Sequence, residues 1–193
     1  SHAAHHQSED YNLSTALRQT GTGAFVSWVF YIPMFLIGIP SYVFVSVASL
    51  NLIYQFWVHS EHIPKLGWYE NYFVTASNHR VHHAQNEQYI DKNYGGVFII
   101  WDRMFGTHKI EDENEACIYG IRSTLNTFNP VWANLHVYVK IVKEMWLSTS
   151  WKDKLYAPFA KTSWTPASFP SAAKKDNFNA ETFKKYDPSI SPK

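Results

Sequence analysis

At 193 residues, 46% of them hydrophobic and 17% aromatic, the chain is long and apolar enough to bury the core of one domain. Its 17 basic and 16 acidic side chains nearly cancel, so its charge gives no reason to expect a nucleic-acid partner. A single cysteine, Cys117, excludes an internal disulfide framework. The anomaly is ten histidines, most of them clustered.

The first expected element is a short helix carrying a His-x-x-His-His arrangement, with His2, His5 and His6. On a helix, at about 100° per residue, positions i, i+3 and i+4 fall within about a third of the circumference, so the three imidazoles can converge. The remnant of an affinity tag is the alternative, but tags are usually uninterrupted runs of histidine. Because neither an initiator Met nor a signal-peptide pattern is present, we expect a fragment or a processed chain.

An uncharged stretch follows, from Gln19 to Ser60, long enough for two helices. It predicts a membrane hairpin whose arms are residues 24–39 and 41–58, with the break at Gly38-Ile39-Pro40 because proline does not continue a helix. Each arm is slightly shorter than the roughly 20 residues that span a bilayer, so the arms either just cross or re-enter. A buried hairpin in a soluble bundle is the alternative.

Histidines return where the second arm ends. His59 and His62 lie one helical turn apart, and a second His-x-x-His-His arrangement places His79, His82 and His83 on another expected helix. We therefore expect a histidine-rich, solvent-facing cap over about residues 59–107, on an all-α integral membrane helical bundle. The isolated His108 and His136 are interpreted as structural or surface residues.

The last expected helix covers residues 131–146, where apolar residues recur at helical spacing opposite lysines, so it packs on the cap or lies at the membrane interface. Residues 148–193 are rich in Pro, Ser, Lys and Ala and predict a loosely ordered polar tail. The expected organisation is one membrane domain over residues 1–147 followed by this tail.

The two triplets predict a site for two metal ions. Imidazole nitrogen suits iron, copper, zinc and nickel, whereas the lack of cysteine clusters argues against zinc-finger and iron–sulfur chemistry. The metal's identity stays open on this evidence.

Four segments carry a resemblance to the fatty acid hydroxylase and sterol desaturase superfamily, and within it to the alkylglycerol monooxygenase branch. They are residues 5–19 (HHQSEDYNLSTALRQ), 54–61 (YQFWVHSE), 78–86 (NHRVHHAQN) and 89–107 (YIDKNYGGVFIIWDRMFGT). A weaker likeness continues through residues 119–122 and 126–130, so that roughly residues 2–146 are covered. The resemblance makes residues 1–147 a membrane domain of the fatty acid hydroxylase type.

The resemblance implies a set of iron ligands and a set of residues around them. The implied ligands are His2, His5, His6, His59, His79, His82 and His83, with His62 as a further candidate because it lies near His59. Asn78 stands where some members have another histidine, and could be a weak ligand or a supporting residue. Because ligating imidazoles usually donate their other N–H to a carboxylate or carbonyl, Asn78, Asn86, Asp91 and Asp102 are the expected supporting groups.

The resemblance also implies an activity. Two ferrous ions would activate O2 for attack on a lipid C–H bond. In this branch the carbon next to the ether oxygen is hydroxylated, and tetrahydrobiopterin is the candidate reductant. The endoplasmic reticulum membrane is the implied location, with the histidine-rich cap as a cytosolic cap, and other membrane subunits are candidate partners. The alternatives are a sterol or fatty acid hydroxylase or desaturase of the same superfamily, a non-catalytic membrane scaffold subunit, and a soluble histidine-rich storage protein, which the uncharged stretch disfavours.

One expected motif does not occur in the printed sequence. Members of the superfamily carry a His-x-x-x-His pair upstream of the first triplet, and this sequence starts after that point. The resemblance therefore predicts that these 193 residues alone bind iron weakly or incompletely, and that a longer protein is the competent enzyme. An iron-to-protein ratio near two for this chain would contradict that expectation.

Overall fold

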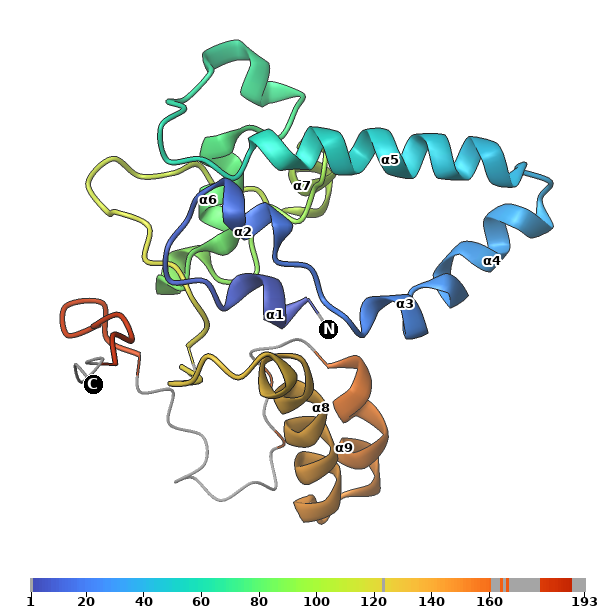
Figure 1. Ribbon diagram of the computed structural model, residues 1–193, viewed down its shortest axis with the longest axis vertical. Helices are drawn as coiled ribbons and strands as arrows, with labels where there is room; N and C mark the ends of the chain where they lie inside the picture. Colours follow the sequence, from blue (N-terminus) through green and yellow to red (C-terminus); the bar gives the residue numbers. More distant parts are fainter. Residues whose placement is uncertain (1, 123, 161–163, 165, 167–177, 189–193) are drawn as a thin grey trace, which may run out of the picture.

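The computed structural model describes residues 2–122, 124–160, 164, 166 and 178–188. Within these ranges the fold is helical, with two isolated β-bridges and no strand, which confirms the predicted all-α class. Figure 1 shows a central group of short helices from which two arms extend, one containing α4 and α5 and the other α8 and α9. The α-helices are α1 (Ala3–His6), α2 (Leu13–Leu17), α3 (Gly23–Val26), α4 (Trp28–Leu36), α5 (Ser41–Trp57), α6 (Ala76–His83), α7 (Ile100–Phe105), α8 (Pro130–Leu147) and α9 (Trp151–Tyr156), and the 3-10 turns are Gly67–Asn71, Glu87–Tyr89 and Ala157–Phe159.

The uncharged stretch forms the predicted hairpin, but its first arm is two helices, α3 and α4, which meet at Ser27. Pro33, which has no N–H to donate, lies inside α4. The chain reverses at Gly38, whose φ of 90° favours glycine, and Pro40 then precedes α5. Phe44 of α5 contacts Tyr31 of α4 near this turn, and the two helices spread apart from there (Figure 1).

The α4–α5 arm exposes its apolar side chains, since no residue of α4 or α5 is buried. Leu36, Leu50 and Ile53 are among the exposed side chains. In the part of the chain that the structure describes, no helix combines the length and the apolar character needed to cross a membrane.

The core surrounds α6, in which seven of eight residues are buried. The helix begins with a capping box, in which the Thr75 amide donates to Asn78 Oδ1 at 3.1 Å. Val81 of α6 is fully buried, as are Val74 and Ile99. This polar helix is therefore almost fully enclosed, which requires its polar groups to have specific partners.

α8 confirms the helix predicted for residues 131–146. Asn129 Oδ1 accepts from the Val131 and Trp132 amides and caps its N-terminus. Its inner face docks on the N-terminal segment, where Gln7 Nε2 donates to the Ala133 carbonyl at 2.7 Å and Asn134 Oδ1 accepts from the Gly21 amide at 2.9 Å.

The first part of the predicted polar tail forms a helix, α9. α9 packs against α8, and residues 178–188 return to the N-terminal segment, where the Tyr186 amide donates to Glu9 Oε2 at 2.6 Å. Residues 161–163, 165, 167–177 and 189–193 of that tail lie outside the described residues. The domain boundary near residue 147 stays a prediction.

Candidate metal centre

Seven histidines meet where α1, α6 and the end of α5 come together, and they are the seven expected as ligands. They form two groups, in each of which the nitrogens available for a metal lie within 4.8 Å of one another. The four-histidine group is His5, His59, His79 and His83, and the three-histidine group is His2, His6 and His82. Among the described residues, no carboxylate or thiolate belongs to either group.

Each triplet divides between the two groups rather than converging on one point. On each helix the residues four apart, His2 with His6 and His79 with His83, join the same group, while the residue between them joins the other. Helix geometry explains this division, because positions i and i+4 differ by about 40° around the axis whereas position i+3 lies about 60° to the other side. Each group thus consists of an i, i+4 pair from one helix and the middle histidine of the other, and His59 from the end of α5 completes the larger group.

Backbone carbonyls fix the orientation of two rings in the four-histidine group. His5 Nδ1 lies 3.1 Å from the Arg18 carbonyl, and His59 Nδ1 lies 2.7 Å from the Gln55 carbonyl. A carbonyl oxygen only accepts, so each Nδ1 carries the proton and each Nε2 presents a lone pair. These two Nε2 atoms face one another at 3.0 Å, and His79 Nε2 lies 3.1 Å from that of His59.

Such an arrangement suits a metal ion. Two lone pairs at 3.0 Å repel each other unless a cation lies between them, and metal–nitrogen bonds of about 2.1 Å meeting at a right angle place two nitrogens about 3.0 Å apart. The buried His83 Nε2 has no hydrogen-bond partner, and an ion among the four rings would supply one. His79 Nδ1 is also without a partner, and the same ion would not satisfy it if it bound His79 through Nε2.

The protonation of these rings is consistent with metal binding. Burial lowers the pKa of His79 and of His83 well below 6.5, and the imidazoles around them lower it further. Burial likewise lowers the pKa of His59 to about 4. The rings are therefore neutral at neutral pH, which is the form that coordinates a metal.

The three-histidine group is more accessible. His2 is exposed, and His6 and His82 are half-buried. His82 Nδ1 lies 3.2 Å from the Lys92 carbonyl, which leaves its Nε2 free in the same way. The ring of His6 stacks on that of His83 with centroids 4.2 Å apart, so the two groups are immediate neighbours. Two metal ions held by them would form one dinuclear centre.

The other three histidines lie outside both groups. His62 is exposed, so its nearness to His59 in the sequence does not bring it to the centre. His108 is half-buried, and His136 lies on α8, where its Nδ1 is 3.5 Å from Gln7 Nε2.

The expected supporting residues organise the loops around α6. Asn78 Oδ1 caps α6, and Asn86 Nδ2 donates to Glu115 Oε1 at 2.8 Å. Asp102 accepts from the Tyr94 and Gly95 amides and from the Thr107 hydroxyl, and Asp91 accepts from the Tyr94 hydroxyl. The ring nitrogens of His5, His59 and His82 instead face the carbonyls of Arg18, Gln55 and Lys92. Sequence patterns do not reveal such partners, because every residue has a carbonyl.

Sequence reasoning did not identify Tyr11, which is buried against the four-histidine group. Its ring centroid lies 5.1 Å from that of His83 and 5.7 Å from that of His59. Its hydroxyl donates to the Val58 carbonyl at 2.9 Å, next to His59 in the chain. Tyr11 thereby ties the segment after α1 to the end of α5.

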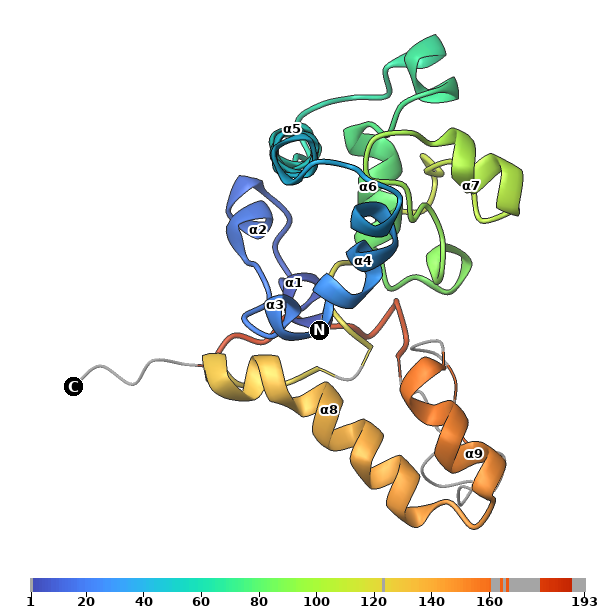
Figure 2. The ribbon, with the colours of Figure 1, turned by 90° about the vertical axis from the view of Figure 1, so that its right-hand side faces the viewer.

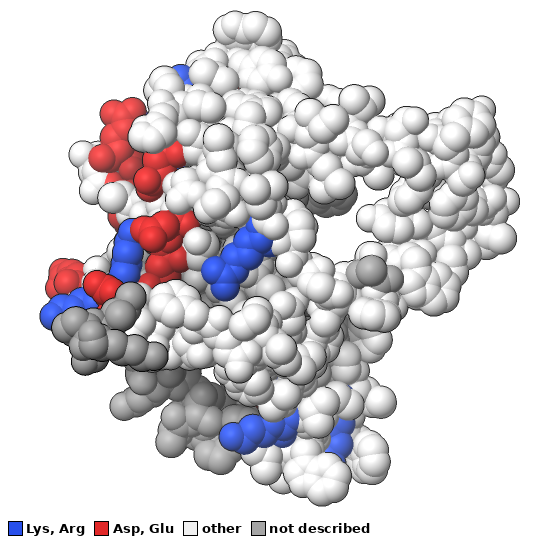
Figure 3. All heavy atoms as spheres, in the orientation of Figure 1, with Lys and Arg blue, Asp and Glu red and all other residues white. Residues whose placement is uncertain are grey.

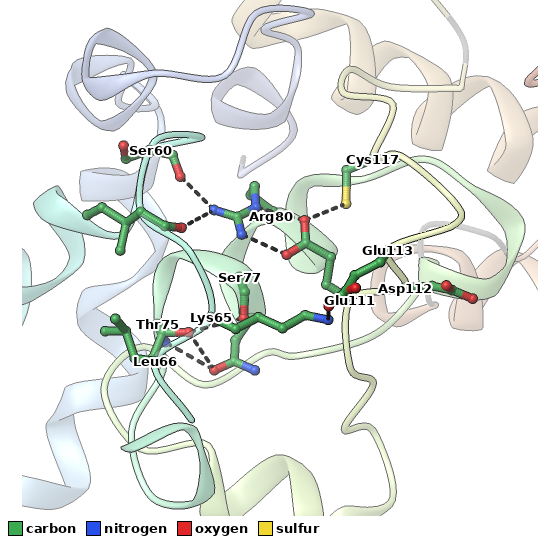
Figure 4. A network of polar contacts seen from close by, with 12 residues as sticks. Ser60, Lys65, Leu66, Thr75, Ser77, Arg80, Glu111, Asp112, Glu113 and Cys117 are labelled. Carbon is green, nitrogen blue, oxygen red and sulfur yellow. Dashed lines mark hydrogen bonds and ion pairs between the residues drawn. The ribbon is translucent and has the colours of Figure 1, made fainter. Parts of the chain in front are cut away.

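Arg80 was also missed, although it stands inside the second triplet. It points away from the histidines into the polar network of Figure 4, where two 2.7 Å hydrogen bonds join it to Glu111 and Nη1 donates to the Ser60 and Ile63 carbonyls. The buried ion pair anchors α6 to the loops on both sides. Its partner, Glu111, lies 31 residues away in a loop, and no sequence pattern predicts a pairing over that distance.

Comparisons with known proteins identify relatives of this chain. The fatty acid hydroxylase family model matches residues 1–107, which contain all seven histidines. The chain is 46% identical over 165 residues to an alkylglycerol monooxygenase of Homo sapiens and 45% identical to one of Xenopus tropicalis, in each case across 86% of this chain and 36% of the relative. An ornithine lipid hydroxylase of Rhizobium tropici is 30% identical over 76 residues, 39% of this chain and 23% of that protein.

The chain therefore spans about a third of the length of the alkylglycerol monooxygenases that it matches. No solved structure matches it. The family match covers more than half of the chain and every histidine of the two groups. The chain belongs to the fatty acid hydroxylase family.

Proposed function

We propose that this chain supplies the di-iron centre of a membrane-bound lipid monooxygenase, and that its substrates are alkylglycerols. The observation that carries the proposal is the pair of adjacent all-histidine groups, with seven ring nitrogens in reach of two ions. Imidazole suits iron, and a histidine shell leaves positions for a further ligand. The two relatives of 45–46% identity named alkylglycerol monooxygenase support the choice of substrate.

The residues of the chain hold and shield the ions. The burial of the four-histidine group excludes bulk water, and the carbonyls of Arg18 and Gln55 keep the Nε2 atoms of His5 and His59 directed inward. Iron, when bound, supplies the reductive activation of dioxygen. Overall, one lipid C–H bond, O2, two electrons and two protons give a hydroxylated lipid and water.

The proposed product follows from the position of the hydroxyl group. On the carbon next to an ether oxygen it forms a hemiacetal, which collapses to a fatty aldehyde and a glycerol derivative. Tetrahydrobiopterin is the proposed donor of the two electrons.

The α4–α5 arm is proposed to enter the bilayer and to bring lipid to the centre. Figure 3 shows this arm without charged side chains, whereas Asp and Glu gather on the opposite side of the face shown. α5 ends at Trp57, next to Val58 and His59, so the apolar arm runs directly into the metal centre. The endoplasmic reticulum, with the cap in the cytosol, is the proposed location.

Product analysis tests this function. The longer protein is purified in detergent and supplied in parallel with an alkylglycerol, a sterol, a fatty acid and an ornithine lipid, each with O2 and tetrahydrobiopterin. We expect a fatty aldehyde from the alkylglycerol and about two irons per protein. A hydroxylated or desaturated sterol, fatty acid or ornithine lipid as the sole product would agree with the proposed metal centre but contradict the proposed substrate. Absence of both metal and product would contradict the proposal and favour a scaffold subunit.

A further inference from the structure

α8 carries an apolar stripe that faces away from the rest of the molecule. Its members recur three or four residues apart and fall within about 80° of the helix circumference. Each is well exposed, from 43% for Leu135 to 83% for Trp146. The stripe consists of Val131, Leu135, Val139, Val142 and Trp146.

α9 and the turn after it continue this apolar surface. Trp151, Leu155 and Phe159 are 76%, 70% and 85% exposed. An open groove lined by Leu155, Phe159, Trp164 and Lys152, among others, runs along this side of α9. Together with the stripe on α8, these residues are called the α8–α9 surface below.

Lysines accompany the α8–α9 surface. Lys143 and Lys152 are exposed, and within the described ranges neither has an acidic group at ion-pair distance. Lys154 Nζ lies 5.2 Å from the ring centroid of Trp151, and Lys140 Nζ lies 3.8 Å from the carboxylate of Glu144, which is buried on the opposite face. Exposed tryptophan and leucine beside lysines match the two layers of an anionic membrane surface, with acyl chains below and phosphates above.

We infer that the α8–α9 surface binds a lipid bilayer that contains anionic headgroups. The apolar stripe enters the boundary between headgroups and acyl chains, and the lysines contact the phosphates. A second copy of the chain is a poorer occupant, because two such surfaces in contact would bring lysines together without acidic partners.

The arrangement of the helices agrees with this surface contact. Figure 2 looks along α5, and α8 runs across the direction of α5 in both Figure 1 and Figure 2. If α5 enters the bilayer, which rests on the proposed function, α8 lies along the membrane surface. The Gln7–Ala133 hydrogen bond, at 2.7 Å, and the one between Tyr138 and Thr22, at 2.9 Å, then fix α1 and its histidines relative to the lipid.

A label on the stripe tests the inference in the whole chain. An environment-sensitive fluorophore is attached at Val142→Cys in a Cys117→Ser background, with Asn114→Cys, on the exposed acidic loop, as the control position. The protein is reconstituted into vesicles of phosphatidylcholine alone or with phosphatidylserine. We expect the label at 142 to move from water into lipid when phosphatidylserine is present, and the label at 114 to stay in water.

The lysines are tested in the same protein. Replacing Lys143 and Lys152 by Gln should lower the equilibrium constant for lipid contact of the label at 142, by about fivefold for each lysine removed. Replacing both by Arg should restore lipid contact. A label that stays in water in both vesicles overturns the inference, as does equal burial without phosphatidylserine. If the label at 142 in detergent became less exposed to water as the protein concentration rose, the surface would instead bind a second copy of the chain, which also overturns the inference.

Iron content of the longer protein, labelled at the same position, separates this inference from the proposed function. About two irons with no lipid contact at position 142 overturns the α8–α9 surface alone. Absence of iron with a label that still enters lipid overturns the metal centre alone.

Discussion

The four-histidine and three-histidine groups are built from the same histidine spacing but differ in how deeply they are buried. Both combine an i, i+4 pair from one helix with the middle histidine of the other. The larger group adds His59 from the end of α5 and is buried, whereas the smaller one is partly exposed at the N-terminus of the chain. Two spaced triplets thus form two histidine groups, but the third segment decides which group is enclosed, so two metal ions bound there should be held unequally.

The largest effect is expected for a change that disturbs both groups at once. Arg80→Met leaves the half-buried Glu111 without its partner and removes the hydrogen bonds to the Ser60 and Ile63 carbonyls, so it should cost about 3 kcal/mol, the lower end for loss of one member of a buried ion pair. Chemical denaturation should show this loss of stability, together with loss of both metals because α6 contributes to both groups. Lys65→Met, which breaks an exposed pair with Glu113, is the control and should change stability by less than about 1 kcal/mol. Equal effects of the two variants would contradict the anchoring role.

Removing one ligand from each group separates the two sites. His59→Ala should weaken the tighter metal by about 100-fold or more, since loss of a group that only supports a ligand already costs 10- to 100-fold. His82→Ala should weaken the other metal and leave the tighter one bound. Stepwise metal titration of both variants measures this, with His62→Ala as the unaffected control. If both variants lost the same metal, the division into two groups would be wrong.

The stability of the metal-free chain should fall in acid because the four-histidine group is buried. The pKa of His59 falls from 6.5 in the unfolded chain to about 4 in the folded one, so the unfolded state binds more protons between these values. The metal-free chain should be insensitive to pH above about 6.5 and lose stability as the pH falls towards 4. His59 should account for about 2 kcal/mol of that loss, allowing for partial contact with water. Thermal unfolding across this range checks the sign, and His59→Gln should flatten the profile.

The smallest effect is expected at Tyr11. Tyr11→Phe removes the hydrogen bond to the Val58 carbonyl, which costs about 1 kcal/mol, and loosens the segment that carries His59. The affinity of the four-histidine group should fall, with no change at the other group. Tyr94→Phe, which removes a hydroxyl bonded to Asp91 near the surface, serves as the matched control. A fall in both affinities would show a general loosening of the fold instead.

Much of this architecture can be predicted from local sequence. The uncharged stretch and Gly38-Ile39-Pro40 predict the hairpin, and apolar spacing predicts α8, because both depend on neighbouring residues. These patterns do not predict the break of the first arm into two helices at Ser27. The triplet spacing identifies the histidines that meet, since i, i+3 and i+4 residues share a side of a helix.

The division of each triplet and the groups around it depend on packing. Which neighbour His5 or His82 faces is decided by how α1 and α6 approach one another. The Arg80–Glu111 pair joins residues 31 positions apart, and the Tyr11–Val58 hydrogen bond joins residues 47 apart. Pairings of that range are set by the tertiary fold and leave no periodic signal in the sequence.

The most direct test of the two-group centre is anomalous diffraction at the iron absorption edge from crystals of the iron-loaded longer protein. We predict two neighbouring peaks, one among His5, His59, His79 and His83 and the other beside His2, His6 and His82. Two peaks each bound by one intact triplet, with His2, His5 and His6 on one ion and His79, His82 and His83 on the other, would contradict it.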